Sequence, residues 1–281
     1  MSRNLRTSHL GRIVASLGTA AIVMTAVAGP ASAALPGNDD IANATVVGAL
    51  PFSDGPDDTT EATTGSTDPT FCFGEPDRST VWYSFTPASS DHYAADTFGS
   101  DYDTTLYVGT SDGAGGINVI ACNDDAQDLQ SAVSWDATAG TAYLLMVGTC
   151  CGGGVVGQAG GGGSLRFHVD LAPPAPTLTL TVDGTGSFNG YGVATIRGSV
   201  NCSNADGVEI DADAVQRVGR VQIHGFGGTF VDCSTSRWSI DISSEDGKYL
   251  GGALSVNVFA FACGTIECAD AFVSKTVRLR H

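Results

Sequence analysis

Short runs in which apolar and polar side chains alternate recur along the chain, separated by clusters of Gly, Ser, Thr, Asn and Asp. Leu106 and Val108, for example, alternate with more polar neighbours. A period of two is typical of half-buried strands, whereas the 3.6-residue apolar period of helices hardly occurs. The pattern therefore predicts an all-β protein. The expected strands cover residues 44–52, 81–86, 92–98, 104–110, 117–122, 132–137, 141–148 and 164–171, and then 178–182, 193–201, 207–215, 238–242, 254–262 and 271–279.

A proline-rich stretch, Ala172-Pro173-Pro174-Ala175-Pro176, divides these strands into two sets. It lacks the backbone donors that the interior of a sheet needs, and it favours an extended, semi-rigid form. We therefore predict a jelly-roll-like β-sandwich over 34–171, a linker over 172–177 and an immunoglobulin-like β-sandwich over 178–281. The second assignment depends on its strand count, its four cysteines and Trp238.

The first 33 residues have the features of a secretory signal peptide. Three arginines precede an apolar run over 13–28, and Ala31-Ser32-Ala33 follows as a cleavage site. We therefore expect a secreted, extracellular protein cut near Ala33. No later apolar run is long enough to predict a membrane span.

All eight cysteines follow the predicted signal peptide, and an exported chain favours disulfides over metal-binding thiols. Within the second half, the natural pairs are Cys202 with Cys233 and Cys263 with Cys268. Cys72 and Cys122 are expected to pair by exclusion, because both lie beside core strands. Cys150 and Cys151 can pair with each other or with other partners, and we adopt the Cys150–Cys151 pair.

The net charge of −17 is concentrated in the first half. Residues 34–172 hold 2 arginines against 19 Asp and Glu, whereas residues 173–281 hold 8 basic against 11 acidic residues. Nucleic acid and anionic membranes bind through clustered Lys and Arg, so neither is an expected partner. Cations or basic proteins suit this surface better.

Acidic side chains flank the hairpin predicted over 104–122. Asp101 and Asp103 precede its first strand, and Asn123, Asp124 and Asp125 follow its second. A hairpin returns its second strand beside the first, so these side chains are expected at one end of a sheet. Clustered oxygen ligands suit calcium, although no EF-hand spacing occurs. The alternative is a solvated sheet end whose Asp residues cap turns.

A family resemblance rests on a series of short motifs: Asn38-Asp39-Asp40, Val81-Trp82-Tyr83-Ser84-Phe85, the segment 100–106, Cys122-Asn123-Asp124-Asp125 and the segment 139–143. In this order they resemble the bacterial pre-peptidase C-terminal domain. The resemblance implies a non-catalytic, calcium-compatible β-sandwich linked with export, adhesion or substrate binding. It implies Asp39, Asp40, Asp103, Asp124 and Asp125 as calcium ligands. Members usually follow a protease. No protease precedes the motifs here, and a protease acting in trans is one candidate partner.

Two features of the second half carry weaker interpretations. Glu209, Asp211 and Asp213 alternate with apolar residues, which places three carboxylates on one face of a strand that we interpret as solvated. His224, followed by Gly225, is interpreted as a turn residue rather than a metal ligand. This half has a weak resemblance to uncharacterised immunoglobulin-like domains of secreted bacterial proteins, carried by 198–202 and 224–233.

These observations predict a secreted, calcium-stabilised binding or accessory protein that acts in adhesion or in the binding of an extracellular protein or polysaccharide. A hydrolase using an unrecognised carboxylate pair and a structural component of the cell envelope are the alternatives. The motif G-x-S-x-G at Gly109–Gly113 does not support the hydrolase, because a nucleophile elbow needs a following helix, and glycines and a strand follow here.

Overall fold

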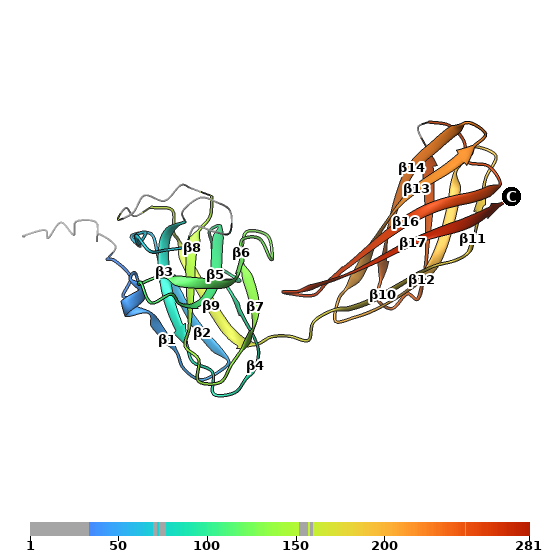
Figure 1. Ribbon diagram of the computed structural model, residues 1–281. Helices are drawn as coiled ribbons and strands as arrows, with labels where there is room; N and C mark the ends of the chain where they lie inside the picture. The colour runs from blue at the N-terminus through green and yellow to red at the C-terminus, as the bar shows by residue number, and fades with distance from the viewer. Residues whose placement is uncertain (1–33, 70–71, 73–76, 152–156, 158–159, 245) are drawn as a thin grey trace, which may run out of the picture. The chain divides into compact units, whose positions relative to one another are not determined.

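The computed structural model describes residues 34–69, 72, 77–151, 157, 160–244 and 246–281. Apart from one short 3-10 helix, η1 (Ile41–Asn43), the regular elements of these residues are all strands (Figure 1). The predicted all-β sandwich class is confirmed. The predicted signal peptide lies outside the described residues.

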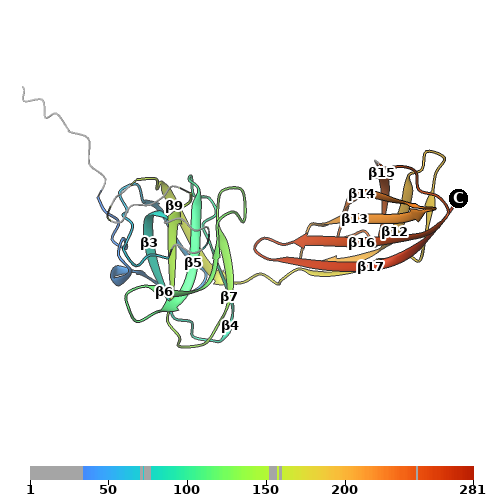
Figure 2. The same cartoon turned by 45° about the horizontal axis from the view of Figure 1, so that its top comes forward.

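The first half contains two sheets. Their strands are β1 (Thr45–Val47), β2 (Phe52–Asp58), β3 (Arg78–Phe85), β4 (Asp91–Asp96), β5 (Thr104–Ser111), β6 (Ile117–Asn123), β7 (Ala132–Ala137), β8 (Tyr143–Thr149) and β9 (Ser164–Leu171). One sheet has the order β1-β3-β8-β5-β6, and the other has the order β2-β9-β4-β7. Figure 2 labels β3, β5 and β6 of the first sheet and β4, β7 and β9 of the second. We call this pair of sheets the first sandwich.

The core of the first sandwich lies between its two sheets. Val81, Tyr83 and Phe85 of β3 belong to it, and the ring of Tyr83 stacks on Phe167 of β9 with 3.9 Å between centroids. Trp82 points to the other face of β3, where it packs with Met146 in a second buried cluster. Strand β3 is therefore buried on both faces, which explains its nearly continuous run of apolar residues.

The prediction of a single strand over 44–52 is wrong. Strand β1 ends at Val47, and β2 begins at Phe52 in the other sheet. Gly48 and Pro51 lie between them. Because proline cannot donate a backbone hydrogen bond and glycine favours turns, the chain leaves one sheet here and crosses to the other.

The second half forms a ladder of eight strands, which we call the second sandwich. They are β10 (Thr177–Val182), β11 (Thr185–Phe188), β12 (Ala194–Ser203), β13 (Gly207–Val218), β14 (Val221–Asp232), β15 (Arg237–Ser244), β16 (Gly252–Cys263) and β17 (Cys268–Arg280). Their order is β10-β12-β11-β17-β16-β13-β14-β15, and β12 also pairs with β15. The ladder therefore closes around its own core.

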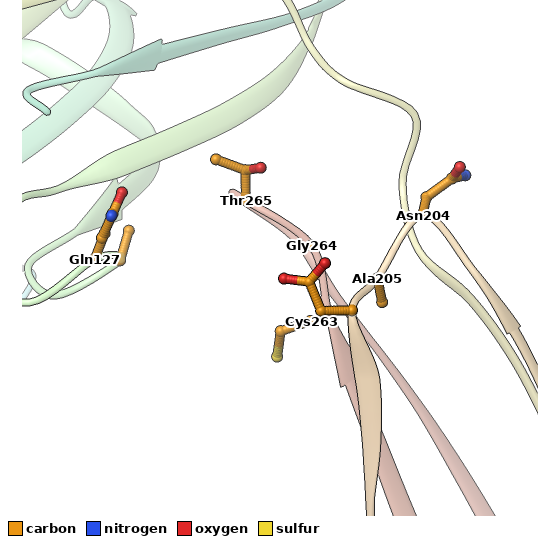
Figure 3. Close-up of a pocket in the computed structure, with 8 residues that line it drawn as sticks. Gln127, Asn204, Ala205, Cys263, Gly264 and Thr265 are labelled. Carbon is orange, nitrogen blue, oxygen red and sulfur yellow. The ribbon is translucent and has the colours of Figure 1, made fainter. Parts of the chain in front are cut away.

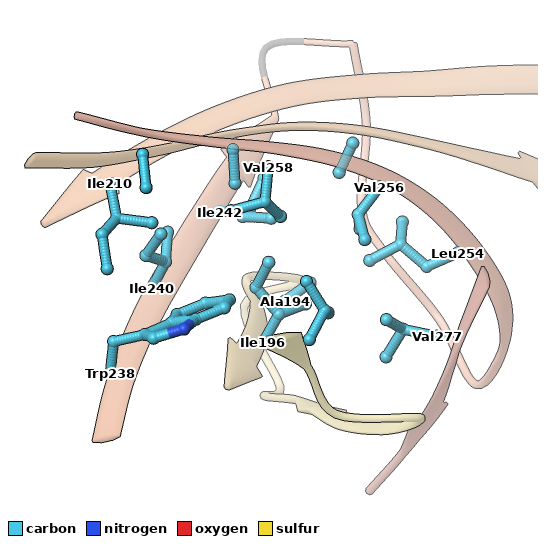
Figure 4. Close-up of a cluster of buried hydrophobic side chains, with 14 of the residues drawn as sticks. Ala194, Ile196, Ile210, Trp238, Ile240, Ile242, Leu254, Val256, Val258 and Val277 are labelled. Atoms are coloured by element: carbon cyan, nitrogen blue, oxygen red, sulfur yellow. The ribbon is translucent and has the colours of Figure 1, made fainter. Parts of the chain in front are cut away.

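Alternate residues of these strands fill that core. Figure 4 shows Trp238, Ile240 and Ile242 of β15 pointing towards the side chains of β12, β13, β16 and β17, and all three are almost fully buried. Trp238 Nε1 donates to the carbonyl of Ser199 at 3.2 Å, so its polar atom is satisfied. The period-two pattern of the sequence thus predicts the inward face correctly.

Strand β14 was not expected, and the interpretation of His224 as a turn residue is wrong. β14 pairs with β13 along its whole length, with Val215 opposite His224. Its glycines allow close packing rather than a turn, since a Cβ at Gly227 would lie 2.8 Å from Cγ2 of Ile240. Glycine permits such close approach of neighbouring strands.

The hairpin of β16 and β17 ends in a compact tip. Cys263 and Cys268 form a disulfide there, and Gly264 N donates to Glu267 O at 2.8 Å. The turn at Asn204 and Ala205 lies beside it (Figure 3), and a Cβ at Gly264 would come within 2.8 Å of the Asn204 carbonyl. The disulfide therefore closes a tip that already packs against its neighbouring turn.

The prediction that the cysteines form disulfides is confirmed. The four pairs are Cys72–Cys122, Cys150–Cys151, Cys202–Cys233 and Cys263–Cys268, as expected from the sequence. Among the described residues no helix has the length and apolar character needed to cross a membrane.

Candidate functional site

The acidic residues of the predicted hairpin lie at one end of the five-stranded sheet. Asp103 immediately precedes β5, and Asp124 and Asp125 immediately follow β6. Strands β5 and β6 are antiparallel neighbours, so the start of one lies beside the end of the other. We call Asp103, Asp124 and Asp125 the acidic triad.

The triad is close enough to hold one cation. Each of its residues offers a carboxylate oxygen, and these three oxygens lie within 4.8 Å of one another. Oδ1 of Asp103 and Oδ1 of Asp124 are both buried without a hydrogen-bond partner. Unsatisfied buried oxygens are costly unless a donor or a cation approaches them. Contacts within the protein therefore leave these two carboxylate oxygens without a donor or a cation.

Backbone contacts fix the loops that carry the triad. The buried Ser131 donates its hydroxyl to the carbonyl of Asp124 at 2.6 Å. Cys150 N donates to the carbonyl of Asp103 at 3.1 Å. Asn123 does not join the triad, because its Oδ1 accepts from Ala132 N at 3.1 Å. The carboxylates are thus presented by loops that are tied to the sheet.

Burial and mutual repulsion disturb the acidity of the triad. Burial, together with the charges of Asp125 and Asp103, raises the pKa of Asp124 to about 6. Burial and the charge of Asp125 also raise the pKa of Asp103. A raised carboxyl pKa means that the ionised form is disfavoured in the folded protein. A bound cation would remove that disadvantage.

Asp77, which the sequence did not single out, lies near the triad. It precedes β3, a strand that begins three residues earlier than the expected Val81. Burial is the main cause that raises its pKa to about 6, and the charge of Asp124 adds to it. Its Oδ2 is buried without a partner. A sequence prediction that began β3 at Arg78 would also have placed Asp77 at this end of the sheet.

Two of the five expected calcium ligands lie elsewhere. The carboxylate of Asp39 accepts from the backbone N and the hydroxyl of Thr63 at 2.5 and 2.8 Å. Asp40 is exposed at the start of η1. Within the described residues, neither belongs to a group of carboxylates close enough to share a metal with Asp103. Asp39 therefore has a structural contact that the motif alone does not reveal.

Asp101 also has a structural role rather than a place in the triad. Its Oδ1 accepts from Ser164 N at 2.7 Å, at the start of β9. The residue therefore ties the approach to β5 to the opposite sheet.

The Cys150–Cys151 disulfide follows β8 and borders the triad. Sγ of Cys150 lies 3.1 Å from Oδ2 of Asp124. Sulfur in a disulfide is not a thiolate and does not serve as a metal ligand. The oxygen atoms of the triad are therefore the ligands that this end of the sheet offers, and their chemistry suits a hard cation such as Ca²⁺.

The motif at Gly109–Gly113 spans the end of β5 and the following turn. The side chain of Asp112 accepts from Ala114 N at 2.7 Å and from Gly116 N at 2.9 Å, and β6 begins at Ile117. The segment is a hairpin turn, as expected, and not a nucleophile elbow.

Comparison with known protein families finds no matching family, and no curated protein matches the chain. Matches among solved structures include the exo-chitosanase CsxA of Amycolatopsis orientalis, at 13% identity and a TM-score of 0.23, covering 69% of this chain and 25% of that one. A DUF4785 family protein of Legionella pneumophila has 11% identity and a TM-score of 0.24, with 71% of this chain and 56% of that chain covered.

A β-D-mannosidase of Dictyoglomus thermophilum has 10% identity and a TM-score of 0.24, with coverage of 72% of this chain and 29% of its own. The chain thus spans about a quarter to a little over half of the length of these three proteins. Likenesses at this level assign neither a family nor an activity.

Proposed function

We propose that the protein is a secreted, non-catalytic binding or accessory protein whose first sandwich is stabilised by calcium at the acidic triad. The resemblance of the first half to the pre-peptidase C-terminal domain supports this class, and its partner would be an extracellular protein or polysaccharide. The four disulfides are compatible with an oxidising setting outside the cell.

One observation carries the calcium part of the proposal. The three residues of the triad each offer a carboxylate oxygen within 4.8 Å of the others, and Oδ1 of two of these residues, Asp103 and Asp124, is buried without a partner. Calcium takes six to eight oxygen ligands, including carboxylates, carbonyls and water. Asp103, Asp124 and Asp125 would hold the ion, and solvent would complete its shell. The bound ion would supply positive charge that offsets repulsion among the three carboxylates.

The disulfide and Ser131 would then act as positioning groups. The hydroxyl of Ser131 lies between the carbonyls of Thr104 and Asp124 and shares its one hydrogen between them, and the backbone N of Cys150 donates to the carbonyl of Asp103. The loops need little reordering on binding, so the entropic cost of binding the ion would be small. Calcium would thereby stiffen one end of the sandwich rather than take part in a reaction.

A hydrolase is the second candidate, because a carboxylic acid with a pKa of about 6 beside another carboxylate is also an acid–base arrangement. We rank it lower on geometry. Glycosidases use two carboxyl groups with separate roles, one on each side of the scissile bond. Three carboxylates gathered within 4.8 Å instead suit one shared cation.

Calorimetric titration of the chain from Ala34 onward with Ca²⁺ tests the proposal. We expect saturable binding at about one site in the wild type, and loss of that binding in D124N. Because Asp128 is exposed in the same loop, D128N makes the same charge change outside the triad and should bind like the wild type. Saturable hydrolysis of a polysaccharide or protein that D124N abolishes would favour the enzyme instead.

A further inference from the structure

The second sandwich exposes an aromatic surface that its fold does not require. Five phenylalanines of β14, β16 and β17 keep between 47% and 65% of their surface accessible. They are Phe226, Phe230, Phe259, Phe261 and Phe272. Exposed apolar patches of this kind usually mark interaction sites. We call the outward side of β13, β14, β16 and β17 the aromatic–acidic face.

Cross-strand register places acidic residues between these rings. β13 pairs with β14 on one side and with β16 on the other. Each outward carboxylate of β13 lies opposite at least one phenylalanine. The cross-strand neighbours are Phe230 and Phe261 for Glu209, Gly228 and Phe259 for Asp211, and Phe226 and Asn257 for Asp213. The face is thus a column of carboxylates with aromatic rings along both sides.

Two further contacts shape this face. The rings of Phe259 and Phe272 pack at 4.6 Å between centroids, so the aromatic side continues from β16 to β17. A Cβ at Gly228 would lie 2.5 Å from Oδ1 of Asp211, so this carboxylate occupies the space that a side chain at position 228 would fill. The neighbour of Asp211 on β14 is therefore a glycine without a side chain, and Phe226 and Phe230 lie to either side of it along β14.

The carboxylates lack cationic partners of their own. None of the ion pairs within the described residues involves Glu209, Asp211 or Asp213. Ionised carboxylates are acceptors only, so a partner must bring donors, and cationic donors bind them most strongly. The flanking rings attract cations through their faces as well. The chemistry of the face therefore selects a cation that also has apolar surface.

A second copy of this chain is a poor occupant. A symmetric contact through the same face would bring the acidic column of one copy against that of the other. Like charges placed opposite each other disfavour the contact. A purely apolar partner would bury the carboxylates without compensation.

The spacing of the column favours an extended peptide. Outward residues of a strand repeat about every 6.6 to 6.8 Å, and this is the repeat of alternate side chains in any extended chain. A peptide lying along β13 with a basic residue at every second position would therefore meet Glu209, Asp211 and Asp213 in turn. Arginine suits both components, since its guanidinium binds carboxylates with two hydrogen bonds and stacks on aromatic rings.

We propose that the aromatic–acidic face binds an extended, arginine-rich segment of a partner protein with a basic residue at every second position. The inference rests on the binding class of function proposed above but not on calcium, because the acidic triad belongs to the other sandwich. It changes the interpretation of the carboxylates of β13, which the sequence pattern presents only as a solvated strand face.

Fluorescence anisotropy with two labelled peptides tests the proposal. In one peptide four arginines alternate with four threonines, and in the other a block of four arginines precedes a block of four threonines. Both are titrated with the chain from Ala34 to His281 in a chelator, so failure of the calcium site does not affect the result. We expect the alternating peptide to bind at least tenfold more tightly than the block peptide, with an affinity that falls as salt rises.

Variants of the face separate its two components. F259S/F261S should weaken binding of the alternating peptide at least tenfold, and D211N should weaken it and reduce its salt dependence. The matched controls are Y191S, which removes a ring that is 85% exposed outside the face, and D241N on β15. Both should bind like the wild type. All four variants alter exposed or half-buried outward positions, and their folding is checked by circular dichroism.

Three outcomes would overturn the proposal. Equal affinity for the alternating and block peptides would show general electrostatic attraction rather than recognition by the face. Unchanged binding by F259S/F261S would exclude the rings. Binding of a protonated glucosamine oligomer, with neither peptide bound, would assign the face to a polysaccharide instead.

Discussion

Asp103 and Asp124 bring two unpartnered buried oxygens to one end of the first sandwich, and their carboxylates lie within 4.8 Å of each other. The antiparallel pairing of β5 with β6 creates this proximity. Burial raises the pKa of both residues, the charge of Asp125 adds to both shifts, and the charge of Asp103 adds to that of Asp124, so the ionised carboxylates are unfavourable without a positive charge.

Removing one of these carboxylates should stabilise the protein when calcium is absent. D124N keeps the shape of the side chain and removes a charge that burial and two neighbours disfavour. We expect a gain of up to about 1 kcal/mol, or about 3 to 5 °C in the melting temperature, because the residue is partly solvated. D128N in the same loop should change the melting temperature little. A lower melting temperature for D124N in chelator would contradict this account.

Stability in chelator should fall as the pH rises from about 4 to 6. The pKa of Asp124 and that of Asp77 are both raised to about 6 in the folded protein, so the folded state holds more protons than the unfolded state across this window. Stability falls with pH wherever the folded state binds more protons. Urea unfolding of the wild type and D124N at pH 4.5 and pH 6.5 measures the effect.

The loss in free energy of unfolding between pH 4.5 and pH 6.5 should be smaller in D124N than in the wild type. Saturating calcium should diminish it as well, because the ion favours the ionised carboxylates. A loss of stability that is equal in D124N and the wild type would assign the pH effect to other carboxyl groups.

Asp39 should matter for folding and not for calcium. Its carboxylate accepts from the backbone N and the hydroxyl of Thr63, and hydrogen bonds to charged groups each contribute about 1.5 to 3 kcal/mol. D39A should therefore lower the free energy of unfolding by about 2 kcal/mol or more while the calcium affinity stays the same. The exposed Asp40 is the matched control, and D40A should cost less than about 0.5 kcal/mol. Loss of calcium binding in D39A, with its fold intact, would restore Asp39 as a ligand.

The two disulfides of the second sandwich should differ in their contributions. Cys202 and Cys233 are 31 residues apart, whereas Cys263 and Cys268 are 5 apart. By chain entropy, the first would contribute about 3 to 4 kcal/mol and the second about 2 kcal/mol. Urea unfolding of C202A/C233A and C263A/C268A measures the order. A larger loss for C263A/C268A would show that packing at the hairpin tip outweighs loop closure.

The sequence predicts most of the fold because burial in these sheets follows a period of two. It is least accurate where glycine and proline occur within or between strands. Gly48 and Pro51 mark a crossing between sheets that the apolar pattern alone does not show. Gly225 and Gly227 resemble a turn, although they lie in β14 and are there because β15 packs closely against them.

The candidate site could be predicted only in part for a related reason. A hairpin brings Asp103 to Asp124 and Asp125, so sequence proximity to strand ends is sufficient for the triad. The contact of Asp39 with Thr63 and the position of Asp77 depend on how distant segments meet. The same holds for the aromatic–acidic face, because the alternation of β13 reveals its carboxylates, whereas only the register with β14 and β16 places phenylalanines beside them.

The melting temperature of the chain from Ala34 onward, in millimolar calcium and in chelator at neutral pH, tests the central claim most directly. A site held at 100 times its dissociation constant contributes about 2.7 kcal/mol, which corresponds to a rise of about 5 to 10 °C for a domain of this size. The account predicts a rise of this size in the wild type and its loss in D124N. Equal melting temperatures in calcium and chelator would reduce the acidic triad to a solvated end of the sheet.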